Sequence, residues 1–227
     1  MVSAIIVAAG SSRRMGFDKL FAPLDGKPVV AHSVEAFQRC EGIRSIVIVT
    51  RPEKIEELER LTADFDKVHA IIPGGEERHR SVWNGLETVS ARNSSFVAIH
   101  DGARPLTTPE LINGCIALAR REGAACCASP IPDTVKRVSP EQIVTGSVER
   151  SGLWAMQTPQ IFSTVLIFQA YAALMASSEL VTDEVSAVQK LGKKIALLKS
   201  EDWNFKITFP RDLELAEQVI KMRKAAA

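Results

Sequence analysis

Short apolar runs alternate with longer amphipathic segments between residues 1 and 130 of the chain. The runs are rich in Ile, Val and Ala and predict buried strands; they cover residues 4–7, 45–50, 68–72, 96–100 and 124–130. The segments between them have helical spacing and cover residues 28–40, 52–61, 76–89 and 108–122, the third of which opens as a loop. This alternation predicts βαβ units and a mainly parallel sheet between two layers of helices.

The pattern changes between residues 131 and 150. Two pieces of alternating polar and apolar residues flank Ser139-Pro140-Glu141, which indicates a β-hairpin. Because a lone hairpin buries little, we expect an arm at about residues 132–151 that projects from the domain and pairs with the same arm of a second subunit. The alternative is a hairpin folded back onto its own domain.

Strands and helices resume after the hairpin. Helices are predicted over residues 164–175, from a cap at Thr182-Asp183-Glu184 to about Leu191, and over residues 210–225. Apolar runs predict two further strands, at residues 195–198 and 205–208. Since no internal repeat or low-complexity linker interrupts the chain, we expect residues 1–227 to form a single domain with one arm.

The composition narrows the possible partners and compartments. A hydrophobic share of 46% suits a folded protein, and a net charge of +1 provides no general field to attract nucleic acid. No apolar stretch reaches the roughly 18 residues that span a bilayer, so no membrane partner is expected. The four cysteines lack metal-ligand spacing, and Cys126-Cys127 lie in an apolar run. Buried, reduced thiols and a cytoplasmic location follow, and the four histidines form no zinc motif.

Three of the predicted strands end in unusual residues. Ala8-Ala9-Gly10 follows the first strand, Gly74-Gly75 the third, and Asp101-Gly102-Ala103-Arg104 the fourth. In a parallel α/β sheet, ligands bind at the carboxyl ends of the strands. We therefore expect the three strand ends to converge on one crevice.

The turn after the first strand combines small residues with cations. Ala8-Ala9-Gly10 leaves the backbone N–H groups accessible, and Arg13, Arg14 and Lys19 follow within a short distance. Such cations supply the charge that a polyphosphate requires, which favours a nucleoside triphosphate site. The sequence contains neither a P-loop nor a dinucleotide fingerprint here, and a plain strand–turn–helix corner with solvated arginines is the alternative.

The other two strand ends suggest a metal and a base. Asp101 beside two small residues suits a magnesium ion held near phosphates, and Arg104 could grip a second phosphate; the alternative is an Asx turn with an Asp–Arg ion pair. Exposed backbone groups at Gly74-Gly75, supported by the Ser81 hydroxyl, could contact the edge of a base. A plain loop with a solvated charge run is equally compatible with that segment.

Seven sequence blocks together resemble one enzyme family. They are, in chain order, A-A-G-S-S-R-R-M-G-x-x-K, G-G-E-E-R-x-x-S-V, H-D-G-A-R-P, D-T-V-K-R, T-P-Q-x-F, T-D-E and N-F-K-I-T-x-P-x-D-L. They run from the first strand to the last helix, and in this order they resemble the 2-C-methyl-D-erythritol 4-phosphate cytidylyltransferases. The resemblance implies a Rossmann-like three-layer α/β/α domain, a homodimer formed through the arm, and dependence on Mg²⁺. It also implies CMP transfer from CTP to 2-C-methyl-D-erythritol 4-phosphate, with release of pyrophosphate.

The resemblance also implies roles for individual residues. Those expected to bind CTP are Ala8, Ala9, Gly10, Gly75, Ser81, Asp101 and Ala103. Arg14, Lys19 and Lys206 are the expected catalytic cations, with Asp101 at the metal. Those expected to bind the acceptor are Arg104, Thr134, Arg150, Thr158 and Thr182, of which Thr134 and Arg150 lie on the arm that reaches the neighbouring subunit's substrate. The phosphate monoester nucleophile has a second pKa of about 6 and is already ionised at neutral pH, so no general base is required.

Three other functions remain open from the sequence. D-Ribitol 5-phosphate cytidylyltransferases share most of the blocks and differ in the acceptor pocket. Sugar-1-phosphate nucleotidylyltransferases have a similar glycine-rich opening but lack H-D-G-A-R-P and the hairpin arm. A non-catalytic nucleotide-binding regulator on the same fold would be expected to have lost Arg14, Lys19 or Asp101, all of which are present.

Overall fold

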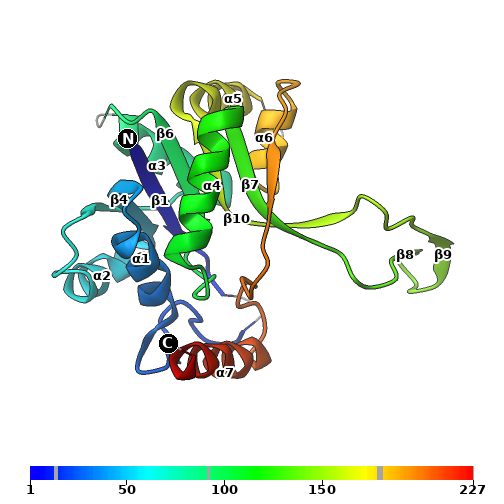
Figure 1. Ribbon diagram of the computed structural model, residues 1–227, viewed down its shortest axis with the longest axis horizontal. Helices are drawn as coiled ribbons and strands as arrows, with labels where there is room; N and C mark the ends of the chain where they lie inside the picture. The colour runs from blue at the N-terminus through cyan, green and yellow to red at the C-terminus, as the bar shows by residue number, and fades with distance from the viewer. Residues whose placement is uncertain (13–14, 91–92, 178–180, 227) are drawn as a thin grey trace.

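The central sheet contains seven strands in the order β11-β7-β10-β6-β1-β4-β5 (Figure 1). The structure, a computed structural model, describes residues 1–12, 15–90, 93–177 and 181–226. The strands are β1 Val2–Ala8, β4 Ile43–Thr50, β5 Val68–Pro73, β6 Phe96–Asp101, β7 Ala124–Pro130, β10 Trp154–Ser163 and β11 Ala196–Lys199. Within the described sheet only β10 is antiparallel to its neighbours. The predicted mainly parallel sheet is confirmed.

Helices cover both faces of this sheet (Figure 1). They are α1 Val29–Arg39, α2 Ile55–Leu61 after a 3₁₀ turn at Pro52–Lys54, α3 Arg78–Ser90, α4 Pro109–Glu122, α5 Thr164–Ala176 and α6 Glu184–Gln189. The last helix, α7 Arg211–Ala225, lies beyond the end of the sheet (Figure 1) and packs with Leu24 and Ile207 in a separate small core. Successive residues of β1 enter opposite cores, because side chains alternate along a strand. Ile6 packs with Phe37 of α1, and Ile5 packs with Leu86 of α3. The expected three-layer α/β/α fold is therefore present.

Two helices, α4 and α6, begin at a residue whose side chain caps the helix. Thr108 accepts a hydrogen bond from the Leu111 N–H at the start of α4, and α4 ends at Gly123 with φ +84°. At α6 the cap is Asp183, whose side chain accepts from the Ser186 N–H. This helix ends at Gln189, slightly earlier than predicted.

The strands differ from the prediction in three places. Residues 205–208 were expected to form a strand, but they pair with no strand of the described chain and contact Ala103 through one backbone bond, Ile207 N–H to Ala103 O at 2.8 Å. Conversely, β10 was not predicted. Its Pro159 lacks an N–H and argues against a central strand. The structure accommodates it through a cis Thr158–Pro159 peptide and a register shift between Met156 and Gln160. The short hairpin of β2 Pro23–Leu24 and β3 Lys27–Pro28 was also not predicted.

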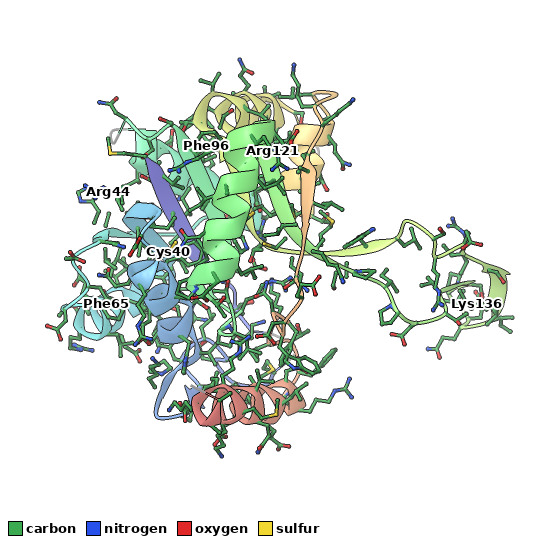
Figure 2. All side chains as sticks on the ribbon, viewed as in Figure 1. Cys40, Arg44, Phe65, Phe96, Arg121 and Lys136 are labelled. Atoms are coloured by element: carbon green, nitrogen blue, oxygen red, sulfur yellow. The ribbon has the colours of Figure 1, made fainter. Side chains whose placement is uncertain are left out.

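The hairpin between β7 and β10 extends away from the sheet (Figure 1). It carries β8 Lys136–Val138 and β9 Val144–Ser147, which pair with each other in an antiparallel ladder. Figure 2, in which Lys136 is labelled, shows the side chains of this arm lying apart from the rest of the chain. Val138, Ile143 and Val144 are 59%, 64% and 62% exposed. The alternative of a hairpin folded back onto its own domain is wrong.

Candidate active site

Two adjoining cavities meet at the carboxyl end of β6. The first, the β1 cavity, has a volume of about 570 Å³ and lies between the turns that follow β1 and β5. The second, the β10 cavity, has a volume of about 920 Å³ and lies between β10, α6 and β11. Among the described residues, Arg78, Asp101 and Lys206 line both cavities. These three side chains form the shared wall of the site.

The turn after β1 forms one side of the β1 cavity. Ala9 and Gly10 line it, and a Cβ atom added at Gly10 would meet nothing within 4 Å, so the backbone there is accessible to a ligand. Ala8 is 1% exposed and packs in the core below, so its side chain does not line the cavity. The predicted residue Arg14 lies outside the described part of the chain.

The turn after β5 faces the turn after β1 and is built around Ser81. The Ser81 Oγ accepts a hydrogen bond from the Gly75 N–H at 3.1 Å and is almost fully buried. A Cβ atom at Gly74 would lie 2.4 Å from the Ala9 Cβ, so only glycine allows the two turns to approach this closely. Gly75 and Ser81 both line the β1 cavity, as predicted, and Ser81 also fixes the shape of its turn.

Two lysines reach the β1 cavity from opposite ends of the sequence. The Lys19 Nζ donates to the Ile207 carbonyl at 2.6 Å, and the Lys206 Nζ donates to Asp101 Oδ2 at 2.9 Å. The segment before α7 thus holds one lysine and supplies the other. Both predicted catalytic lysines line the same cavity, together with Ala103.

Asp101, the last residue of β6, is surrounded by cations. Arg78 donates to its Oδ1, Lys206 to its Oδ2, and the Arg104 Nε lies 3.6 Å from Oδ2. Burial opposes ionisation, but the charges of Arg78, Lys206 and Arg104 outweigh it and hold the pKa of Asp101 well below its usual range. Asp101 is therefore ionised at neutral pH.

His100 and Thr158 fix the backbone at Asp101 from below. The Thr158 Oγ1 accepts from the Asp101 N–H at 3.1 Å and lies 3.0 Å from the His100 Nδ1, while the His100 Nε2 lies 3.3 Å from the Arg104 carbonyl. A neutral ring with its proton on Nε2 satisfies both contacts. Burial lowers the pKa of His100 to about 3, so the ring remains neutral at physiological pH.

The β10 cavity contains three of the predicted acceptor-binding residues, Arg104, Thr158 and Thr182. The Arg104 Nη1 donates to the Asn204 carbonyl at 2.8 Å, which fixes the guanidinium. Its Nε is buried and forms no hydrogen bond to the described residues, but it lies 3.6 Å from Asp101 Oδ2. The guanidinium therefore brings a fixed positive charge to the wall of this cavity, which suits an anionic ligand.

The two predicted arm residues lie elsewhere. Thr134 and Arg150 are exposed and line neither the β1 nor the β10 cavity of their own chain. Arg150 donates to the Pro132 carbonyl at the base of the arm. One chain alone therefore does not bring these residues to the shared wall.

Two residues of the site were not predicted from the sequence. Arg78 lies inside the G-G-E-E-R-x-x-S-V block and Glu184 inside T-D-E, but both were interpreted as parts of a charge run or a helix cap. In the structure the two side chains form a bidentate pair at 2.5 and 3.1 Å. Their place inside the family's sequence blocks was the signal that could have identified them, because a charged residue in such a block is less expected to be only solvated.

Comparison with known proteins identifies the family of this chain. A family model described as 2-C-methyl-D-erythritol 4-phosphate cytidylyltransferase matches residues 2–222. The chain belongs to this family. A protein of that name from Alkaliphilus oremlandii is 38% identical over 98% of this chain and 96% of its own length. Another from Caldanaerobacter subterraneus is 39% identical over 97% of this chain and 99% of its own length.

Solved structures of the family share the fold. The 4-diphosphocytidyl-2C-methyl-D-erythritol synthase of Anaerococcus prevotii superposes with a TM-score of 0.86 at 28% identity, covering 97% of this chain and 96% of that chain. The 2-C-methyl-D-erythritol 4-phosphate cytidylyltransferase of Thermus thermophilus gives 0.80 at 29% identity, covering 96% and 98%. Across the described residues, no helix has the length and apolar character needed to cross a bilayer.

Proposed function

We propose that this chain transfers CMP from CTP to 2-C-methyl-D-erythritol 4-phosphate, giving 4-diphosphocytidyl-2-C-methyl-D-erythritol and pyrophosphate in the non-mevalonate isoprenoid pathway. Membership of the family supports this reaction. The observation that carries the proposal is the wall of Arg78, Asp101 and Lys206 shared by the two cavities. A transfer between two polyanions needs their reacting phosphates to meet at one cationic surface.

The β1 cavity is proposed to hold CTP. Ala9 and Gly10 offer accessible backbone to the phosphates, with Ala8 shaping the turn from below, and Gly75 and Ser81 form the opposite turn for the base. Lys19, together with Arg14, would stabilise charge at the α-phosphate. Ala103 lines the same cavity beside Asp101.

The β10 cavity is proposed to hold the polyol phosphate. Arg104 offers the charge of a fixed guanidinium, Thr158 and Thr182 line the cavity, and Lys206 faces it from the shared wall. Since the attacking phosphate is already ionised at neutral pH, these groups need only neutralise it and align it with the departing pyrophosphate.

We further propose that Asp101 is the protein ligand of a magnesium ion. Within the described residues no group of three or more His, Cys, Asp or Glu side chains could hold a metal by itself. A single ionised carboxylate facing a phosphate cavity suits an ion that takes its other ligands from phosphates and water. When bound, the ion would neutralise phosphate charge.

We also propose a homodimer formed through the arm. Thr134 and Arg150 would then line the acceptor site of the neighbouring subunit. The exposed Val138, Ile143 and Val144 support this, because a two-stranded hairpin gains stability when its apolar side chains are covered. A cytoplasmic location is consistent with the four free, buried cysteines.

The function is tested by pyrophosphate release from CTP and magnesium with either 2-C-methyl-D-erythritol 4-phosphate or D-ribitol 5-phosphate. Turnover with the first acceptor alone is expected. Turnover with the second acceptor alone would be consistent with the same mechanism but would assign the protein to another pathway. CTP binding without turnover of either acceptor would instead favour a regulator.

A further inference from the structure

Glu184 is a fully buried carboxylate next to the site. It is the first residue of α6, and its side chain is 0% exposed. A buried charge is costly unless it is paired and hydrogen-bonded. Glu184 has both kinds of partner: Arg78 binds its two oxygens, and the Tyr171 hydroxyl of α5 donates to Oε1 at 3.0 Å.

The residues on either side of Glu184 are both bound by Gln160 of β10, Asp183 through its side chain and Val185 through its backbone N–H. The Gln160 Nε2 donates to Asp183 Oδ2 at 3.1 Å, and its Oε1 accepts from the Val185 N–H at 3.0 Å. Gln160 is itself 2% exposed. The central sheet therefore fixes the position of the carboxylate, since the residues before and after it are tied to the same strand.

Arg78, the first residue of α3, uses two edges of its guanidinium. Nη1 and Nη2 face Glu184, while Nε and Nη2 donate to Asp101 Oδ1 at 3.3 and 3.2 Å. The guanidinium is planar and rigid, so fixing one edge fixes the other. A lysine could not connect the two carboxylates in this way, because its ammonium is a single point of charge.

We propose that Glu184, held by Tyr171 and Gln160, orients Arg78, and that Arg78 in turn positions Asp101 at the wall shared by the two cavities. Glu184 and Tyr171 are positioning residues that act through Arg78 and touch neither substrate. If Asp101 binds another partner, such as a metal ion, the Nε and Nη2 atoms of Arg78 still face the shared wall. They can then donate hydrogen bonds to a phosphate. The inference rests on the proposed function, because it assigns the shared wall to the reaction.

The ionisation of the group is consistent with this role. Burial opposes the charge of Arg78, but Glu184 and Asp101 outweigh it and raise its pKa well above its ordinary value. Burial, followed by the charge of Glu184, raises the pKa of Tyr171 well above its ordinary value. Arg78 therefore remains a cation and Tyr171 a hydrogen-bond donor throughout the physiological range.

A double-mutant cycle separates positioning from simple structural support. Glu184→Gln keeps the side-chain shape and removes the charge; we expect kcat to fall about tenfold, since small misplacements at a reacting centre are costly. The KM values for CTP and acceptor should each change less than about threefold. Tyr171→Phe, a milder variant, should lower kcat in the same direction by a smaller factor. In an Arg78→Gln background, Glu184→Gln should change kcat by less than about twofold.

The matched control is Glu35→Gln on α1. Glu35 forms ion pairs with Lys27 and Arg39 and lines neither the β1 nor the β10 cavity. It should lower the melting temperature without changing kcat. The proposal is overturned if Glu184→Gln behaves like this control, or if its effect on kcat multiplies with that of Arg78→Gln.

A measurement without turnover keeps the inference separate from the proposed function. In the ligand-free protein, the Arg78 Nε–H resonance of a ¹⁵N-labelled sample should be protected from solvent exchange, and Glu184→Gln should accelerate that exchange while Glu35→Gln does not. Absence of turnover by the wild-type protein would overturn the proposed function. The exchange rate of this resonance would still show whether Glu184 orients Arg78. An unchanged exchange rate in Glu184→Gln would overturn the inference even in an active enzyme.

Discussion

Lys19 brings a cation to a cavity wall made mostly of small and polar residues. Its Nζ is held by the Ile207 carbonyl, and the side chain is 9% exposed. A preorganised cation that stabilises charge developing at the α-phosphate contributes mainly to kcat. Lys19→Ala should therefore lower kcat by about 100-fold or more in the pyrophosphate-release assay.

A surface lysine provides the comparison for this prediction. Lys27 pairs with Glu35 and lines neither the β1 nor the β10 cavity, so Lys27→Ala should keep kcat near the wild-type value. If Lys19→Ala remained within about threefold of wild type at saturating substrates, Lys19 would have no part in the mechanism.

His100 makes the ligand-free protein sensitive to acid. Burial lowers its pKa to about 3, whereas an unfolded histidine titrates near 6.5. Between these values the unfolded chain binds the extra proton, so this contribution to stability is complete above about pH 6.5 and declines as the pH falls, by about 1.4 kcal/mol per unit. His100→Asn, which cannot bind a proton, should flatten the curve of unfolding free energy against pH in this range. An equally steep curve in urea titrations would rule out His100 as the source.

At this scale the sequence was sufficient to predict the positions of residues that follow directly from a strand end. Gly75, Ser81 and Asp101 follow predicted strands, and the parallel sheet brings them to one edge. The Arg78–Glu184 pair was not predictable in the same way, because it joins positions 106 residues apart. A charged residue that is buried by tertiary packing has the same local sequence pattern as a solvated one.

At the scale of elements, the alternating βαβ pattern was predictable because β1, β4, β6 and β7 are buried along most of their length and read as apolar runs. The edge strand β5 is only partly buried, but its apolar residues were enough to predict it. β10 was missed because it mixes polar residues with Pro159, and its pairing omits the segment between Met156 and Gln160. That same segment carries Thr158, which fixes the Asp101 backbone. The irregularity that concealed the strand therefore serves the site.

The loop after β1 is tied to β4 by Arg51. The Arg51 Nη1 donates to the Gly10 carbonyl at 3.3 Å, and Nη2 pairs with Asp18, so one guanidinium holds both ends of the loop that carries Lys19. Arg51→Ala should lower kcat/KM for CTP about tenfold, because the loop loses its anchor. Initial rates at varied CTP would measure this loss.

Glu53→Gln is the control for the loop anchor. Glu53 pairs with the Arg51 Nε at 3.0 Å but is 65% exposed, and exposed pairs contribute little. This variant should resemble wild type. If Arg51→Ala and Glu53→Gln had equal effects, the loss would come from the local ion pair and not from the anchoring of the loop.

At the scale of the whole molecule, the proposed dimer predicts that the arm of one subunit contacts the acceptor bound to the other subunit. Arg150→Glu places a negative charge where the resemblance expects a contact with the acceptor of the neighbouring subunit. The KM for 2-C-methyl-D-erythritol 4-phosphate should rise more than the KM for CTP, as measured by initial rates with each substrate varied. Equal effects on both would argue against this role of the arm.

Mixing variants tests whether the arm crosses between subunits. After exchange of subunits, Lys19→Ala and Arg150→Glu chains should form heterodimers with one intact site, in which the Arg150→Glu chain supplies the cavities and the other chain supplies the arm. Activity should exceed the sum of the two separate variants. Simple addition would show that each arm serves its own chain.

The wall shared by the two cavities has a consequence for inhibitor chemistry. Because Arg78, Asp101 and Lys206 face both cavities, a single compound that joins a cytidine-like group to a polyol phosphate could occupy both without crossing solvent. Linking the two halves turns the second binding event into an intramolecular one, which raises affinity without any new contact. Such a bisubstrate ligand would bind to the shared wall through the group that links its two halves.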